Sequence, residues 1–211
     1  MEFNLNRTID VKLNVRPVTL ALYHNYVFEG PCRFESGEKL KKEHDLKVNA
    51  KRHQNFVESV HDVLPEEEVN ILEPILFQYD ESFLVTDSDL ETVGKNSHLV
   101  DLYLFSGGVT DLLLEFPRKY KKPMIVLNRC INTMSTASLK ARGYEIHPCQ
   151  TLADAAEMMR ILRVRKALSQ TRVLAFNRMM LPPAKNGPVF AVLWTHLKVA
   201  DFEDGAVRAA V

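Results

Sequence analysis

The amino-acid sequence predicts an α/β fold, a three-layer, mostly parallel sheet of the Rossmann-like or flavodoxin-like kind with helices on both faces. Short apolar runs recur along the chain, stretches with helical spacing of apolar residues separate them, and the links between them are short. Strands and helices that alternate in this way form parallel sheets, because each helix carries the chain back across the sheet. Crossovers in such folds are right-handed, and ligands bind at the carboxyl ends of the strands.

Composition limits the class of protein. The chain has 211 residues, of which 46% are hydrophobic, enough for the core of one domain of ordinary size. Lys and Arg together number 27, as do Asp and Glu, so the charge balance does not favour a nucleic-acid binder. Apolar runs fall well short of the roughly 20 residues of a membrane helix, and the first ten residues do not resemble a signal peptide. We therefore expect a cytoplasmic protein with no nucleic-acid partner and no membrane partner.

The chain begins with a predicted strand, a loop and a helix. Residues 18–28 are rich in Val, Leu, Tyr and Phe, which favour a buried strand. Residues 29–45 read as a loop that contains glycine and proline. Residues 56–64 carry apolar side chains at steps of three and four, and Pro65 stops this helix.

Shorter elements follow. Residues 69–72 are predicted as a second strand, and residues 75–85 as a further extended segment. Asp87 is expected to cap a short helix that runs through Val93, and Gly94 is expected to end it.

The second half repeats the strand–helix order more clearly. Predicted strands cover residues 100–105, 123–128 and 144–147, and predicted helices cover residues 110–120 and 135–142. The first of these helices is expected to turn Leu112, Leu113 and Phe116 inward and to be kinked or shortened at Pro117. Gly143 stands where the second needs a left-handed cap.

The last predicted helix begins at a capping box formed by Thr151 and Asp154 and runs to about residue 168. Residues 172–177 are expected to form the fourth parallel strand, beside 18–25, 100–105 and 123–128. Beyond residue 180 the pattern becomes rich in turn residues. We therefore expect an α/β domain over 1–178, and the start of a second domain or a truncated tail over 179–211.

Candidate binding residues follow the predicted strands at the edge where ligands bind. They are His24, Glu29, Arg33, Ser106, Gly107, Gly108, Asn128 and Arg129. Each group also has a plain structural interpretation: a solvated loop after the first strand, a tight turn that needs glycine after the 100–105 strand, and a turn at Asn128. Both interpretations remain open at this point.

The chemistry of these groups suits a polar ligand. Arg33 can bind a carboxylate or phosphate through two parallel hydrogen bonds, while His24 and Glu29 can bind hydroxyls or exchange protons. Free amides at 106–108, before a helix, can hold an anion or a sugar hydroxyl. The sequence contains no dinucleotide, P-loop, zincin or nucleophile-elbow motif, and no metal-ligand spacing. We assign no catalytic residue and no metal ligand.

Three runs carry a family resemblance: VDLYLF, LLLEFPRKYKKPMIVLN and STASLKARGYEIHPCQTLADAAEMMRILRVRKALSQTRVLAF. Together they resemble the N-terminal region of fucose/arabinose isomerase-like proteins. The shared features are a strand that begins Val-Asp, a Lys-Lys-Pro entry to the next strand, and a long helix that leads to Thr-Arg-Val-Leu. The resemblance covers roughly residues 15 to 178.

The resemblance implies a sugar-isomerase scaffold, in which aldose and ketose are interconverted with a divalent metal, typically manganese. The metal-binding and proton-moving residues of that family lie in later domains, and none is carried over to this chain. The expected function is thus an N-terminal domain or fragment that contributes to a sugar pocket or to a homo-oligomer interface and is inactive alone. The alternatives are a non-enzymatic sugar- or small-molecule-binding domain, with a flavodoxin-like or periplasmic-binding-protein-like sheet, and a purely structural subunit.

Overall fold

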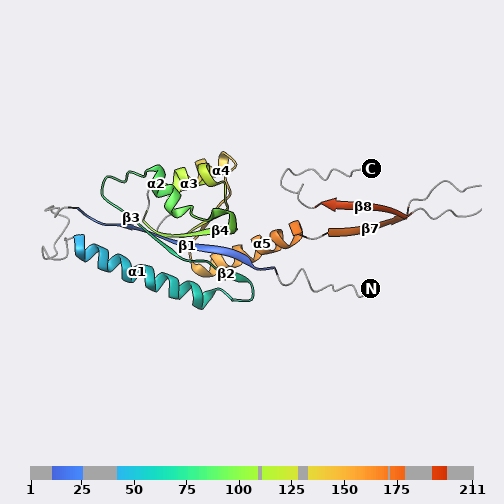
Figure 1. Cartoon of the computed structure of the whole chain (residues 1–211), viewed down its shortest axis with the longest axis horizontal. Helices are drawn as coiled ribbons and strands as arrows, with labels where there is room; N and C mark the ends of the chain where they lie inside the picture. The colour runs from blue at the N-terminus through green and yellow to red at the C-terminus, as the bar shows by residue number, and fades with distance from the viewer. Residues whose placement is uncertain are drawn as a thin grey trace, which may run out of the picture. The chain divides into compact units, whose positions relative to one another are not determined.

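The computed structural model describes residues 11–25, 42–108, 111–127, 133–170, 172–178 and 192–198. The chain divides into two compact units, the larger of which is Lys12–Ile161. The elements that begin in this unit (Figure 1) are β1 (Leu13–Leu22), α1 (Lys42–Val63), β2 (Val69–Ile71), β3 (Ile75–Tyr79), α2 (Asp87–Val93), η3 (Ser97–Leu99), β4 (Leu102–Gly107), α3 (Leu112–Tyr120), β5 (Met124–Leu127), α4 (Thr133–Ala141), β6 (Ile146–Cys149) and α5 (Leu152–Gln170).

The sheet of the larger unit is six-stranded, with the order β2-β1-β4-β5-β6, and β3 also pairs with β1. Every pairing is parallel. Leu13 pairs with Val69 of β2, and Val18 pairs with Ile75 of β3, while β4 takes the other edge of β1. Strands β2 and β3 therefore act as one interrupted strand, and the order becomes that of a flavodoxin-like doubly wound sheet. The predicted fold class is confirmed.

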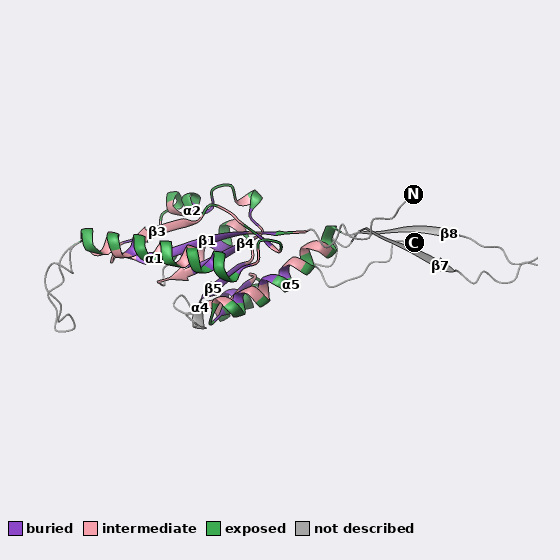
Figure 2. Ribbon diagram, turned by 90° about the horizontal axis from the view of Figure 1, so that it is seen from below, coloured by how far each residue is buried: buried purple, intermediate pink, exposed green. Residues whose placement is uncertain are grey.

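Helices cover both faces of this sheet. Figure 1 shows α1 on one side and α2, α3 and α4 on the other, and Figure 2 shows α1 and α5 on the same side. Consecutive residues of β4 point to opposite faces, yet Leu102, Tyr103, Leu104 and Phe105 are all 0% exposed. A strand that is apolar and buried on both faces is typical of a parallel sheet between two helical layers. None of the described helices has the length and apolar character needed to cross a bilayer.

Aromatic packing joins α3 to the sheet. The Phe116 ring lies edge-on to Tyr103 and Phe105, with centroids 4.7 and 5.6 Å apart. Leu112 and Leu113 are buried with Phe116, so the predicted inward face of this helix is confirmed. The helix continues past its internal proline for one more turn, because its own core contacts hold it in place, and it ends at Tyr120.

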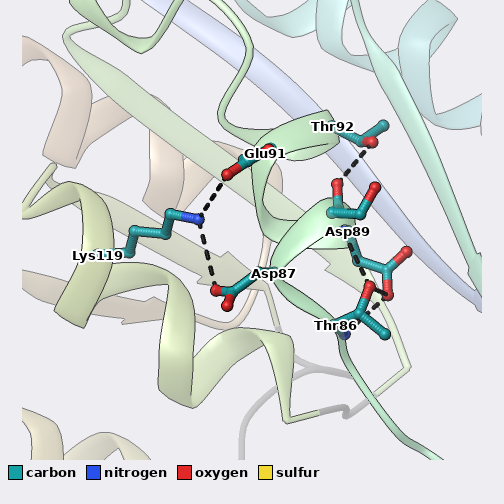
Figure 3. Close-up of polar contacts among 7 residues, drawn as sticks. Thr86, Asp87, Asp89, Glu91, Thr92 and Lys119 are labelled. Atoms are coloured by element: carbon teal, nitrogen blue, oxygen red, sulfur yellow. Dashed lines mark hydrogen bonds and ion pairs between the residues drawn. The ribbon is translucent and has the colours of Figure 1, made fainter.

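Polar side chains connect α2 to α3 at the surface (Figure 3). The Lys119 ammonium lies 3.2 Å from a carboxylate oxygen of Glu91 and 3.5 Å from one of Asp87. The capping box of α2 consists of Thr86 and Asp89, so the predicted cap at Asp87 is wrong by one residue. The Thr86 hydroxyl accepts a hydrogen bond from the Asp89 amide, and the Asp89 carboxylate accepts one from the Thr86 amide. A cap at Asp87 would leave these two amides without hydrogen-bond partners.

Helix α1 begins at Lys42, well before the predicted start at residue 56. Its first half is mostly polar, so the apolar spacing that indicates a helix is weak there. Tertiary contacts stabilise it instead. The buried Asn49 side chain donates to the Leu22 carbonyl at 2.8 Å, and the Thr19 hydroxyl lies 2.8 Å from Nδ1 of His53. Burial lowers the pKa of His53, which favours the neutral ring at this contact.

The smaller unit contains β7 (Arg172–Arg178) and β8 (Val192–Lys198), which pair antiparallel in a sheet of their own. The predicted strand at 172–177 exists, but its assignment to the parallel sheet is wrong. The segment between β7 and β8 is rich in turn residues and has no predicted helix. Strands joined without a crossover helix pair antiparallel, because parallel neighbours need a long connection.

Candidate functional site

The carboxyl ends of β1 and β4 mark the place where the sheet topology changes direction. After β1 the chain crosses to β2 and β3 on one side, and after β4 it crosses to β5 on the other. The two connections therefore leave adjacent strands in opposite directions, which is the position where doubly wound folds bind ligands. We call the carboxyl ends of β1, β3 and β4 the carboxyl edge. Its polar and glycine residues include His24, Asn25, Asp80, Glu81, Ser106, Gly107 and Gly108.

A histidine–carboxylate pair lies just after β1. One oxygen of Asp45 accepts hydrogen bonds from the His24 backbone amide at 3.0 Å and from His24 Nδ1 at 2.8 Å. Because a carboxylate only accepts, the hydrogen of this bond is assigned to Nδ1. Both side chains are largely buried, with 20% and 22% exposed. Asp45 lies in the first turn of α1, where a negative charge also suits the helix dipole.

Asn25 connects three elements at the same edge. Its backbone amide donates to the Glu81 carboxylate at 3.1 Å, and its side-chain amide donates to Asp80 at 2.9 Å. Its side-chain oxygen accepts from the Lys42 ammonium at 3.1 Å, and that ammonium lies 4.5 Å from the centre of the Tyr23 ring. The end of β1 is thereby tied to the end of β3 and to the start of α1.

Hydrogen bonds also fix the carboxylate of Asp80. Its Oδ1 accepts from the Ser82 hydroxyl and, at 3.0 Å, from the Ser82 backbone amide. These bonds to Ser82, with smaller help from Asn25 and Lys42, lower the pKa of Asp80. The carboxyl edge therefore keeps this group ionised.

Two glycines allow β4 to end tightly against β1. Gly107 has φ +113°, and a Cβ on it would lie 2.0 Å from the Leu20 carbonyl oxygen. A Cβ on Gly108 would lie 2.1 Å from the Tyr79 hydroxyl. The Gly108 amide donates to the Leu20 carbonyl at 2.9 Å, so it is not free for a ligand. The backbone requires glycine at 107, as the tight-turn interpretation predicts, whereas at 108 a Cβ would meet the Tyr79 side chain.

The structure brings four of the predicted binding residues to this edge, namely His24, Ser106, Gly107 and Gly108. The other four, Glu29, Arg33, Asn128 and Arg129, lie outside the described residues. Sequence reasoning missed Asp45, because the predicted loop extended over the start of α1. It also missed the Asp-Glu pair at 80–81, although two acids directly after an apolar run are a signal for a strand end.

The described residues do not fit a manganese centre. Within those ranges, no three His, Cys, Asp or Glu side chains come together as metal ligands. His147 and Cys149 of β6 are of residue types that can bind metals. The His147 Nε2 atom lies 3.1 Å from a carboxylate oxygen of Glu145, and burial raises the pKa of the Cys149 thiol. Both groups on β6 thus have ordinary structural surroundings.

Comparisons with known proteins give no match. No protein-family model, no curated protein and no solved structure matches the chain. What the structure defines is the class, a parallel α/β domain with a polar carboxyl edge at its switch point.

Proposed function

We propose that this chain is a small-molecule-binding α/β domain whose ligand is a neutral, hydroxyl-rich compound of the sugar type. The observation that carries the proposal is the carboxyl edge itself, where the His24–Asp45 pair stands beside the topological switch between β1 and β4. Ligand sites of α/β sheets combine this position with a few fixed polar groups. The hydrogen bonds at His24 and Asn25 supply that fixation.

Local charge favours a neutral ligand over a phosphate. Asp45, Asp80 and Glu81 lie at or beside the carboxyl edge, and Asp111 directly precedes α3. Among the described residues, the Lys42 ammonium donates to the side-chain oxygen of Asn25, and Asn25 in turn donates to Asp80 and Glu81. Carboxylates accept hydrogen bonds from hydroxyls and repel anions. A sugar hydroxyl therefore suits the edge better than a phosphate does.

The finer form of the proposal is that the domain serves a sugar isomerase, as the resemblance implies. The domain would then shape part of the sugar pocket in a homo-oligomer and leave metal chemistry to other parts. We expect the purified chain not to convert L-fucose or L-arabinose to the ketose in the presence of manganese. Turnover by the chain alone would place the reaction within it and contradict this form.

Binding is tested by calorimetric titration of the full chain with neutral sugars and with their phosphates. Asp45→Asn removes the charge that holds His24 and should weaken sugar binding roughly tenfold, because a hydrogen bond to a charged group is worth about 1.5–3 kcal/mol. Arg33→Lys, at a position outside the described residues, tests the predicted hydrogen bonds from the Arg33 guanidinium to the ligand. The control is His98→Gln, an exposed histidine on η3 before β4 begins.

The outcomes separate cleanly. Binding of neutral sugars that weakens in Asp45→Asn and is unchanged in His98→Gln supports the proposal. Preference for the phosphates, equal affinity in Asp45→Asn, or no binding of any sugar would contradict it.

A further inference from the structure

The turn after β3 holds an aromatic residue in an unfavourable backbone conformation. Phe83 has φ +56°, in the left-handed region that bulky residues rarely adopt. Such a conformation costs free energy and persists only where surrounding contacts enforce it. Two hydrogen bonds hold the turn in this conformation. The Phe83 backbone amide donates to the Asp80 carbonyl at 3.1 Å, and the Leu84 backbone amide donates to the Ser82 hydroxyl at 3.3 Å.

The strained turn leaves its apolar side chains in solvent. Phe83 is 44% exposed and Leu84 is 74% exposed. Asn25 anchors the first residues of the turn, Asp80 and Glu81, to the end of β1. A rigid turn that exposes an aromatic ring beside carboxylates combines the two components of a small-molecule site, an apolar surface and fixed polar groups.

The exposed Phe83 ring contacts a buried ring at the carboxyl edge. The rings of Phe83 and Tyr79 lie 5.7 Å apart, tilted by 45°. The hydroxyl of Tyr79 in turn reaches the backbone of Gly108 at the end of β4, close enough that a Cβ there would collide with it. Contacts therefore link the exposed Phe83 ring, through the buried Tyr79 side chain, to Gly108 beside the switch between β1 and β4.

We propose that Phe83 is the stacking platform of the ligand site, which narrows the ligand to a cyclic sugar with an apolar ring face. In a pyranoside, C–H groups point from the ring face and hydroxyls lie around the rim. The negative face of an aromatic ring attracts the positively polarised C–H groups, and Asp80 and Glu81, in the same turn as Phe83, would supply carboxylate acceptors for rim hydroxyls. This inference rests on the proposed function and adds the shape of the ligand to it.

The test uses the full chain in saturation-transfer NMR and calorimetry, with methyl β-D-glucopyranoside and methyl β-D-galactopyranoside as cyclic probes and D-glucitol as the acyclic probe. The wild type should bind at least one pyranoside more tightly than glucitol, with the strongest saturation on ring C–H protons. Phe83→Ala should weaken that binding roughly three- to tenfold, as expected for the loss of one aromatic contact. Phe83→Tyr keeps the ring and should keep the affinity.

The controls separate folding from binding. Alanine keeps a Cβ, so Phe83→Ala retains the backbone strain of the turn, and its amide spectrum shows whether the fold is kept. Leu99→Ala removes a comparably exposed apolar side chain from η3, which is 53% exposed at Leu99, and should leave binding unchanged.

Two results would overturn the inference in different ways. A wild type that binds pyranosides and a Phe83→Ala variant that binds them equally would remove Phe83 and leave the proposed function standing. A wild type that binds no sugar would remove the proposed function with it. Concentration-dependent self-association in light scattering that Phe83→Ala abolishes, with sugar affinity unchanged, would assign the ring to a protein interface instead.

Discussion

The backbone of Gly107 lies so close to Leu20 that a Cβ on the glycine would fall 2.0 Å from the Leu20 carbonyl oxygen. The two residues are register partners at the carboxyl ends of β4 and β1. The close approach brings the two strand ends together where the chain turns in opposite directions. The carboxyl edge is therefore set by main-chain packing, on which the polar side chains are then placed.

Gly107→Ala should destabilise the fold by roughly 2–4 kcal/mol in urea unfolding, because the backbone oxygen it meets cannot move aside and its φ is unfavourable for alanine. Gly143→Ala is the matched control. It has φ +85° but no atom within 4 Å of the added Cβ, so it should cost only about 1 kcal/mol. Equal losses in the two variants would show that the contact with Leu20 is unimportant.

Asp45→Asn should release the end of β1 from α1, because the amide cannot offer His24 a charged acceptor. We expect a loss of about 1–2 kcal/mol in unfolding free energy and faster amide exchange in the first turns of α1. Glu43→Gln removes another acidic charge from the same turn, where Glu43 is exposed, and controls for the helix dipole. If Glu43→Gln lost as much unfolding free energy as Asp45→Asn, the loss would be due to the helix dipole and not to the hydrogen bonds with His24.

Lys121→Gly should stabilise the protein by about 0.5–1 kcal/mol in thermal or urea unfolding. Lys121 caps the end of α3 with φ +50°, and its amide donates to the Pro117 carbonyl at 3.0 Å. Glycine adopts this left-handed position without steric cost. The neighbouring Lys122 does not have a positive φ, so Lys122→Gly should not stabilise. A stabilising effect of both or of neither would be inconsistent with the cap geometry.

Tyr103 should make the fold sensitive to alkali. Burial raises the pKa of its phenol to about 12, against the lowering effect of the nearby Arg16 guanidinium. The stability that the neutral phenol contributes is complete below the unfolded pKa near 10 and is lost between pH 10 and 12. At pH 11 the wild type should therefore have lost about 1.4 kcal/mol relative to Tyr103→Phe.

The same variant has a second expected result near neutral pH. The Tyr103 hydroxyl is buried without a hydrogen-bond partner among the described residues. Its removal should leave stability at pH 7 unchanged or slightly higher. A large loss at pH 7 would reveal a partner for the hydroxyl, and unchanged relative stability at pH 11 would contradict the raised pKa.

The parallel sheet was predictable because its strands are apolar on both faces and are punctuated by glycine, proline and capping residues. The box at Thr151 and the left-handed Gly143 appear as their residue types predict. Gly94 follows α2 without a left-handed conformation, and its surroundings exclude a side chain. Its φ is −82°, and a Cβ there would collide with the Tyr120 ring. Such a contact between distant residues leaves no trace in local spacing.

The candidate site was predictable only in outline. His24 and the glycines at 107 and 108 directly follow apolar runs, so their place at a strand end could be inferred. The partner of His24 could not, because Asp45 is brought there by a helix whose first half lacks apolar spacing. The antiparallel pairing of β7 with β8 was missed although the sequence carries a signal for it, a turn-rich connection with no helical pattern between the two strands.

Small-molecule binding at the carboxyl edge is tested most directly by titrating the isotope-labelled chain with methyl β-D-glucopyranoside and methyl β-D-galactopyranoside and following its amide signals. Saturable shifts are expected for residues 23–25, 80–84 and 106–108, while residues 96–99, which precede β4, should not move. Shifts confined to residues 96–99, or no saturable shift with either pyranoside, would contradict a sugar site at the switch between β1 and β4.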